Sequence, residues 1–175
     1  MKAALQALLP RLGVNPAEVQ ILEHEGVQDL ERSLPRKLRA WRDPAARFLV
    51  LRDNDNGDCL ARKSRLTAIV EAAGRAKHTK IRIVCQELEA WFIGDRAALE
   101  ASAVFGTIPR TFPIPDPDAV VTPSAKLRNI RRDYGKIAGA RAIAPHLDID
   151  NSRSASFRHT IQAIRDLITA KGNPP

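Results

Sequence analysis

The sequence predicts an α/β fold, in which a mainly parallel sheet is flanked by helices and followed by an α-helical C-terminal part. Short apolar runs alternate with amphipathic helical stripes over the first 105 residues, as in βαβ units. After a proline-rich segment at residues 106–123, only helical patterns remain. With 175 residues we expect one domain: a core at 1–105, a loop at 106–123, and a helical extension at 124–175 packed on the core.

The spacing of apolar residues predicts each element in turn. Leucines recur at helical spacing over residues 2–12, and this helix, which ends at Gly13, is expected to pack on the sheet. The uninterrupted apolar run within residues 47–52 is typical of a strand buried on both faces. The other expected elements are strands at 18–23 and 80–85, and helices at 29–41, around 66–73, near 123–146 and at 153–170.

The formal net charge of +8 is unevenly spread, because two basic blocks at residues 31–80 and 126–175 flank a net acidic segment at 81–125. A basic excess favours a polyanion such as nucleic acid; the alternative is a solvated basic face without a partner. No apolar run approaches the roughly 18 residues of a membrane span, so no membrane partner is expected. Cys59 and Cys85 lack zinc-ligand spacing, and we expect them to be reduced in a cytoplasmic protein.

Acidic residues directly follow two of the expected strands. Asp53 and Asp55 follow the apolar run, and on an extended segment their side chains leave the same face. Glu87 and Glu89 follow the strand at 80–85 and emerge at the same edge if the sheet is parallel. Ligands of open α/β sheets bind beyond the carboxyl ends of strands, and oxygen ligands suit Mg²⁺ or Mn²⁺. These four residues are therefore the candidate metal ligands and catalytic groups.

Other interpretations of these motifs stay open. The loop after Asp53 could be a polar loop whose Asp58 caps the next helix, or an Asn56-Gly57 hairpin turn, although a helix follows it. A calcium loop is excluded, because Gly57 and Ser64 stand where ligands are required. The two glutamates could simply form an acidic first helical turn, which the helix dipole favours.

Four arginines are the candidate nucleic-acid contacts: Arg128, Arg131, Arg132 and Arg153. The first three recur in a helical segment that also carries Lys126 and Lys136, so several of these charges can share a face. Arg153 opens the last helix, where it can face a phosphate or simply lie beside a serine N-cap. We expect these arginines to hold phosphates on the rim of the acidic site rather than to read bases.

Four motifs, in this order along the chain, resemble the domain of unknown function 4276 family, a Toprim-like group. They are Leu30–Pro35 ahead of Trp41, Val50–Asp55 with Asp58 and Cys59, Glu87–Trp91 with Gly94 and Asp95, and Arg153–Phe157. The resemblance implies a Toprim fold, which coordinates Mg²⁺ with an Asp-x-Asp pair and a Glu and acts on phosphodiesters. Carried over, Asp53 and Asp55 become metal ligands, and Glu87 and Glu89 become auxiliary ligands or a general base.

The resemblance also implies a partner ATPase and a role in phage-defence or restriction-like systems. Its pattern begins with a strand that ends in a catalytic Glu, whereas this chain opens on a helix at Lys2. We expect either an internal start or a chain that lacks this strand. The expected function is a divalent-metal-dependent phosphodiester hydrolase, or nuclease. The alternative is a non-catalytic subunit that binds nucleic acid or a partner on a truncated Toprim scaffold.

Overall fold

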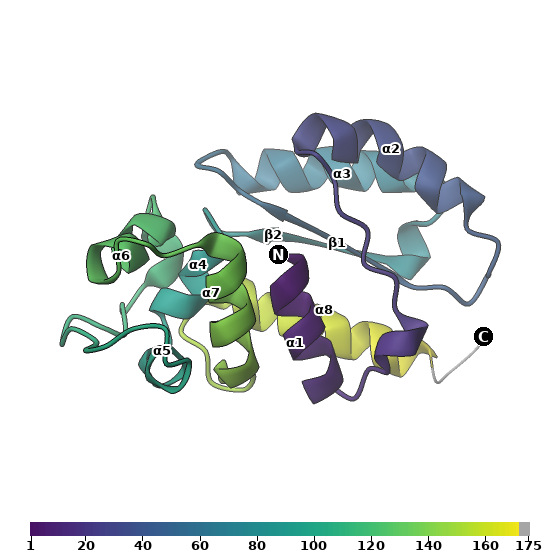
Figure 1. Ribbon diagram of the computed structural model, residues 1–175. Helices are drawn as coiled ribbons and strands as arrows, with labels where there is room; N and C mark the ends of the chain where they lie inside the picture. The colour runs from purple at the N-terminus through teal and green to yellow at the C-terminus, as the bar shows by residue number, and fades with distance from the viewer. Residues whose placement is uncertain (172–175) are drawn as a thin grey trace.

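A computed structural model describes residues 1–171, and its centre is a small parallel sheet enclosed by helices (Figure 1). The sheet has two strands, β1 (Phe48–Asp53) and β2 (Thr79–Val84), connected through α3 (Cys59–Ala72). The strands pair in parallel, from Phe48 opposite Thr79 to Asp53 opposite Val84. The predicted α/β fold is confirmed, as are the two strands that precede the acidic motifs.

Helices cover both faces of this sheet. α2 (Val27–Ala40) packs with α3 on one face, and α8 (Ala155–Lys171) packs on the other (Figure 1). The remaining helices are α1 (Lys2–Arg11), α4 (Glu89–Ile93), α5 (Arg96–Ala101), α6 (Pro123–Ile130) and α7 (Lys136–Ile143). Single 3₁₀ turns are η1 (Pro16–Glu18), η2 (Ala76–His78), η3 (Pro117–Ala119) and η4 (Ala144–His146). Over residues 1–171, no helix is long and apolar enough to cross a membrane.

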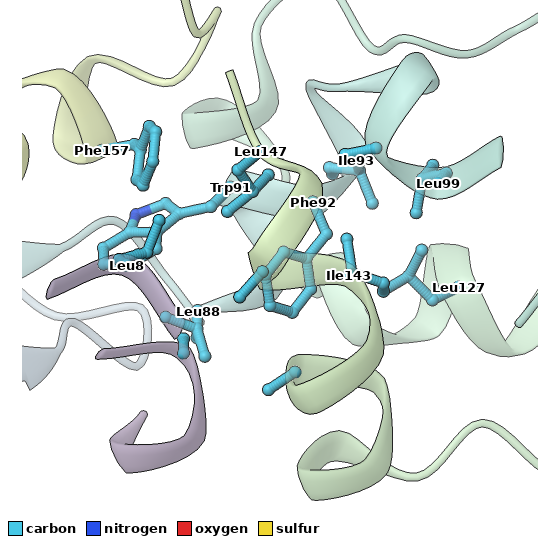
Figure 2. Packing of buried hydrophobic residues seen from close by; sticks show 14 of the residues in the cluster. Leu8, Leu88, Trp91, Phe92, Ile93, Leu99, Leu127, Ile143, Leu147 and Phe157 are labelled. Atoms are coloured by element: carbon cyan, nitrogen blue, oxygen red, sulfur yellow. The ribbon is translucent and has the colours of Figure 1, made fainter. Parts of the chain in front are cut away.

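Two hydrophobic cores form, one on each face, because successive side chains of a strand point to opposite faces. The smaller core joins the sheet to α2 and α3 through Leu30, Leu34, Leu38, Val50, Leu66, Val70 and Ile81. The larger core joins the other face to the C-terminal helices around Trp91 and Phe157 (Figure 2). The Trp91 indole N–H donates to Ser156 Oγ at 3.1 Å, and its ring centroid lies 4.9 Å from that of Phe157. Trp91 therefore fixes the short helix α4 on α8.

The expected strand at residues 18–23 is wrong. Val19 has an extended backbone, with φ −119° and ψ 127°, but the described sheet contains only β1 and β2. Val19 and Ile21 line a groove beside α1 instead, while Leu22 is 43% exposed. The β-propensity of such residues reflects packing on a paired neighbour, and this segment has none.

The expected packing of the first helix on the sheet is only partly correct. Ala4 and Leu8 of α1 are fully buried in the larger core, which includes Val84 of β2. Most neighbours of α1, however, belong to α7 and η4. The apolar face of α1 is therefore covered chiefly by the C-terminal helices, which sequence patterns could not place beside it.

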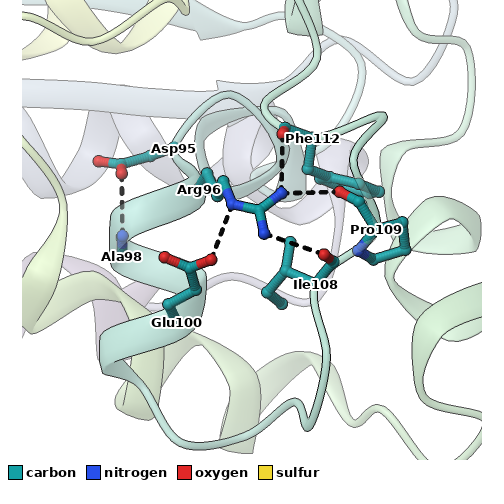
Figure 3. A network of polar contacts seen from close by, with 7 residues as sticks. All are labelled: Asp95, Arg96, Ala98, Glu100, Ile108, Pro109 and Phe112. Atoms are coloured by element: carbon teal, nitrogen blue, oxygen red, sulfur yellow. Dashed lines mark hydrogen bonds and ion pairs between the residues drawn. The ribbon is translucent and has the colours of Figure 1, made fainter.

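One arginine ties the proline-rich segment to α5 (Figure 3). Residues 106–116 contain no helix or strand, so their carbonyls need other partners. Arg96 donates to the carbonyls of Ile108 at 3.0 Å, Pro109 at 2.9 Å and Phe112 at 3.2 Å, and to the Glu100 carboxylate at 2.7 Å. These bonds fix the course of a loop that has little secondary structure of its own.

Arg96→Ala should lower the free energy of unfolding by about 1–3 kcal/mol, because three loop carbonyls lose a charged donor. Urea unfolding measures this loss. Arg110→Ala is the matched control, since it removes the same charge from an exposed position of the same loop. The control should change the free energy by no more than about 0.5 kcal/mol. Equal effects of the two substitutions would contradict this role for Arg96.

Candidate functional site

The parallel ladder brings both acidic motifs to one edge of the sheet. Asp53 is the last residue of β1 and lies opposite Val84, the last residue of β2. The pairing continues beyond the strands: the Asn54 N–H donates to the Val84 carbonyl at 2.9 Å, and the Asp55 N–H donates to the Gln86 carbonyl at 3.0 Å. The segments that follow the two strands therefore leave the sheet side by side.

The loop after β1 turns sharply rather than remaining extended. Asp55 and Asn56 adopt the left-handed conformation, with φ of 46° and 58°, which Asp and Asn tolerate better than most residues. The Asp55 side chain is 61% exposed, and its carboxylate lies 3.9 Å from Arg62 Nη1. Gly57 allows this approach, because the Arg62 guanidinium occupies the space that a Cβ at position 57 would need. The extended geometry expected for Asp53 and Asp55 therefore ends at Asp53.

Two of the alternative roles considered for the acidic motifs are present in the structure. The Asp58 carboxylate caps α3, since it accepts from the backbone N–H groups of Leu60 at 2.8 Å and Ala61 at 3.2 Å. Glu89 lies in the first turn of α4, as a dipole-favoured residue would. These local roles account for Asp58, but they leave the burial of Asp53 unexplained.

Of the carboxylates in the site, that of Asp53 is the one whose charge is least compensated by hydrogen bonds and nearby cations. Its Oδ1 atom is buried and has no hydrogen-bond partner. Burial, and then the negative charges of Asp55 and Glu89, raise the pKa of Asp53 to about 6. The Met1 amino group and Lys136 oppose this shift only in part. A cation that reached Asp53 would stabilise its charged form.

Glu87, in contrast, is fully partnered. The Ser124 N–H donates to Glu87 Oε2 at 2.9 Å, and the Ser124 hydroxyl donates to Oε1 at 3.1 Å. The Lys136 ammonium donates to the same Oε1 at 2.6 Å. Burial alone would raise the pKa of Glu87, but the hydrogen bonds from Lys136 and Ser124 outweigh it and lower this pKa. Glu87 is therefore a stable anion bound by groups of α6 and α7.

The charge of Glu89 is compensated better than that of Asp53 but less well than that of Glu87. Glu89 is only 2% exposed, and burial raises its pKa, while the charge of Lys136 acts in the opposite direction. The Lys136 ammonium lies 4.0 Å from Glu89 Oε2, and the Tyr134 hydroxyl donates to Oε1 at 3.4 Å. Both contacts are long, so the charge of Glu89 is less well compensated than that of Glu87.

The four candidate arginines occupy different surroundings. Arg128 is exposed on α6, and its charge lowers the pKa of Tyr134, which burial raises overall. Arg132 is also exposed. Arg131 is already bound, because its guanidinium pairs with Asp133 at 2.8 Å and donates to the Val104 carbonyl. Arg153 is exposed and lies beside Gly94, the residue that follows α4.

The donor chemistry of the site fits a hard divalent cation. Over residues 1–171, no three His, Cys, Asp or Glu side chains are already arranged to hold a metal ion. The Lys136 ammonium is already paired with the Glu87 carboxylate, and the Asp55 carboxylate is turned toward Arg62. Nevertheless the donors are all carboxylate oxygens, and the buried Oδ1 of Asp53 lacks a partner. Asp53, Asp55 and Glu89 are therefore the residues that would hold such an ion.

Sequence reasoning did not connect Ser124, Tyr134 and Lys136 with the carboxylates. Ser124 follows Glu87 by 37 residues and Lys136 follows it by 49, on the far side of the proline-rich segment. No periodicity links positions so far apart. The excess of basic residues after position 125 predicted a cationic surface, and that surface supplies the partner of Glu87.

The pKa of Asp53 makes the stability of the protein depend on pH. Its folded value of about 6 lies above the ordinary value of 3.8, so the folded state binds more protons between these two pH values. The free energy of unfolding should therefore fall as the pH rises from about 4 to about 6. Asp53→Asn avoids this loss and should stabilise the protein by about 2–3 kcal/mol at about pH 8, and by much less at about pH 4.

Denaturant unfolding of wild type and variant at the two pH values, in the presence of a chelator, measures this difference. Asp116→Asn is the control, because it neutralises an exposed carboxylate of the proline-rich segment. The control should show no pH-dependent gain. A stabilisation of equal size at both pH values in Asp53→Asn would contradict the assignment.

The comparisons with known proteins give one match. No curated protein and no solved structure is significantly similar to the chain. The family model described as Domain of unknown function (DUF4276) matches residues 1–165 and so includes both acidic motifs, Ser124, Lys136 and most of α8. Because this match spans nearly the whole sequence, the chain belongs to the DUF4276 family.

Proposed function

We propose that this chain is a divalent-metal-dependent phosphodiester hydrolase that acts on nucleic acid. The observation that carries the proposal is the buried, unpartnered Oδ1 of Asp53, at the carboxyl ends of two parallel strands. Asp55 and Glu89 lie close enough to raise the pKa of Asp53. Three carboxylates in one place repel one another, and a cation that binds between them removes this repulsion.

In this proposal Asp53, Asp55 and Glu89 hold Mg²⁺ or Mn²⁺. Bound by these residues, the ion would supply Lewis-acid chemistry toward a phosphoryl oxygen and would lower the pKa of a water. Glu87 remains paired with Ser124 and Lys136 and holds α4, α6 and α7 around the site. The Arg62 contact to Asp55 is long, at 3.9 Å, so the Asp55 carboxylate can turn toward the metal at little cost.

Basic side chains near these elements supply the attraction for phosphate. Arg128 is exposed on α6, Arg132 is exposed just after this helix, and the net charge of the chain is +8. Phosphate contacts of this kind position a nucleic acid without reading its sequence. Arg131 contributes less in this proposal, because Asp133 already neutralises it.

A second candidate is a non-catalytic subunit that binds nucleic acid or a partner protein. It is favoured by the Lys136 ammonium, which already pairs with Glu87 at 2.6 Å, and by the Asp55 carboxylate, which lies on the side of Arg62. A partner ATPase and a role in phage defence remain predictions from the family resemblance.

A nuclease assay with single- and double-stranded DNA and RNA separates the two candidates. Wild-type protein should cleave at least one substrate with Mg²⁺ or Mn²⁺ and lose this activity with a chelator. Asp53→Asn, which should still fold, is expected to lower the rate by at least about 100-fold, because it removes a metal ligand. Asp116→Asn should cleave at the wild-type rate. Binding without cleavage by the wild-type protein would favour the non-catalytic subunit.

Salt dependence tests the phosphate contacts separately. Arg128→Gln should weaken binding of all sequences alike and reduce the slope of log affinity against log salt by about 1. Arg131→Gln removes the same charge from a guanidinium that is already paired, and it should leave the slope nearly unchanged. Binding that is insensitive to salt, or equal effects of both variants, would argue against this surface.

A further inference from the structure

The outer edge of β2 is not paired with another strand of residues 1–171, because the described sheet contains only β1 and β2. The Val84 carbonyl of β2 accepts from the Asn54 N–H on the β1 side. Because the backbone groups of successive residues in a strand point to opposite sides, the N–H and carbonyl groups of Ile81 and Ile83 point away from β1. The outer edge of β2 therefore presents backbone donors and acceptors that no strand of the described residues pairs with.

A groove runs along this edge. It is lined by four consecutive residues of β2, Thr79–Arg82, by Lys63, Thr67 and Val70 of α3, and by Ala76. Side chains of a strand alternate between the two faces of a sheet, so four consecutive lining residues show that the groove follows the edge and not one face. Its volume of about 190 Å³ is below the roughly 300–1,000 Å³ of most small-molecule pockets. An extended chain segment therefore suits this groove better than a small-molecule ligand.

The charges along this groove are positive. Lys63, Lys80 and Arg82 line it, and no acidic side chain is among the described residues that do so. Lys63 is exposed on α3, which covers one face of the sheet, while α8 covers the other (Figure 1). The Lys80 ammonium lies 3.2 Å from the carboxylate of Asp166 on α8, but the two side chains are 41% and 37% exposed. An exposed pair of this kind is weak, so both lysines can turn toward an anionic partner.

One outward backbone group already has a charged donor. Arg82 Nη1 donates to the Ile81 carbonyl at 2.9 Å, and Arg82 Nε donates to the His159 carbonyl of α8 at 2.9 Å. Charged side chains at a sheet edge hinder pairing with unrelated strands. A carboxylate is a stronger acceptor for a guanidinium than a carbonyl is, so an acidic side chain can draw Arg82 away from Ile81. The edge therefore favours an acidic strand over a neutral or basic one.

We propose that the outer edge of β2 binds an extended, acidic segment of a partner protein, which adds to the sheet as a third strand. In strand addition of this kind, hydrogen bonds to the backbone supply affinity, here at Ile81 and Ile83, and side-chain contacts supply specificity. Carboxylates of the added segment meet Lys63 beside α3 and Lys80 and Arg82 beside α8. The inference goes beyond the proposed hydrolase function and does not depend on it.

Titration with short blocked peptides, followed by fluorescence anisotropy and by amide hydrogen exchange, tests the proposal. A peptide of alternating valine and glutamate should bind and slow the exchange of the Ile81 and Ile83 amides at least about 10-fold, because these N–H groups then lie in a ladder. A peptide with proline in place of each valine keeps the charge but cannot pair as a strand, and it should not bind. A peptide with lysine in place of each glutamate should not bind either.

Two matched variants isolate the position of the charge. Lys63→Glu reverses an exposed charge beside the groove and should weaken binding of the valine–glutamate peptide about 5-fold. Lys126→Glu reverses an exposed charge on α6 and should bind like the wild-type protein, and circular dichroism checks that both variants are folded.

Three results would overturn the proposal: no binding of the valine–glutamate peptide, equal binding of all three peptides, or unchanged exchange at Ile81 and Ile83. Equal effects of Lys63→Glu and Lys126→Glu would also contradict it. A single-stranded oligonucleotide that slows exchange at these two amides more than the peptide does would assign the groove to nucleic acid instead. Loss of nuclease activity leaves this test unaffected, because the peptide assay needs no catalysis.

Discussion

The parallel ladder between β1 and β2 is the constraint on which the site depends. Six residue pairs, ending at Asp53 opposite Val84, bring two segments that are distant in sequence to one edge. A one-residue slip would move every side chain of a strand to the opposite face, so the apolar cores on both faces fix the register. The same cores therefore determine which carboxylate is buried and which is exposed.

The C-terminal half of the chain supplies the groups that contact the glutamates beyond the strand ladder. The strands supply Asp53 and lead to Glu87 and Glu89, but the partners of the glutamates come from α6, α7 and the segment before α7. Packing of Trp91 between Leu8 of α1 and Phe157 of α8 joins these parts around α4 (Figure 2). The site is therefore assembled by tertiary packing and has no counterpart in any isolated segment.

Local patterns predicted the two paired strands, most helices and the sheet edge that both acidic motifs follow. The uninterrupted apolar run before Asp53 is a strong local signal for a strand buried in a sheet. The end of this run also places Asp53 at the carboxyl end of the strand, where ligands of α/β sheets bind. Residues 18–23 carry similar apolar residues but find no partner strand, which no local pattern reveals. The left-handed turn at Asp55 and the pairing of Lys136 with Glu87 depend on distant contacts, and these lay beyond sequence reasoning for the same reason.

Gly139 has no side chain, yet its contact with Tyr134 affects the carboxylates of the site, because the Tyr134 hydroxyl donates to Glu89. A single methyl group at residue 139 would meet the Tyr134 ring and hydroxyl and displace the group that donates to Glu89. Glu89 in turn acts on the protonation of Asp53. The acid–base balance of the site is thus set partly by steric room on a neighbouring helix, and small-to-large changes there would act on it as electrostatic mutations do.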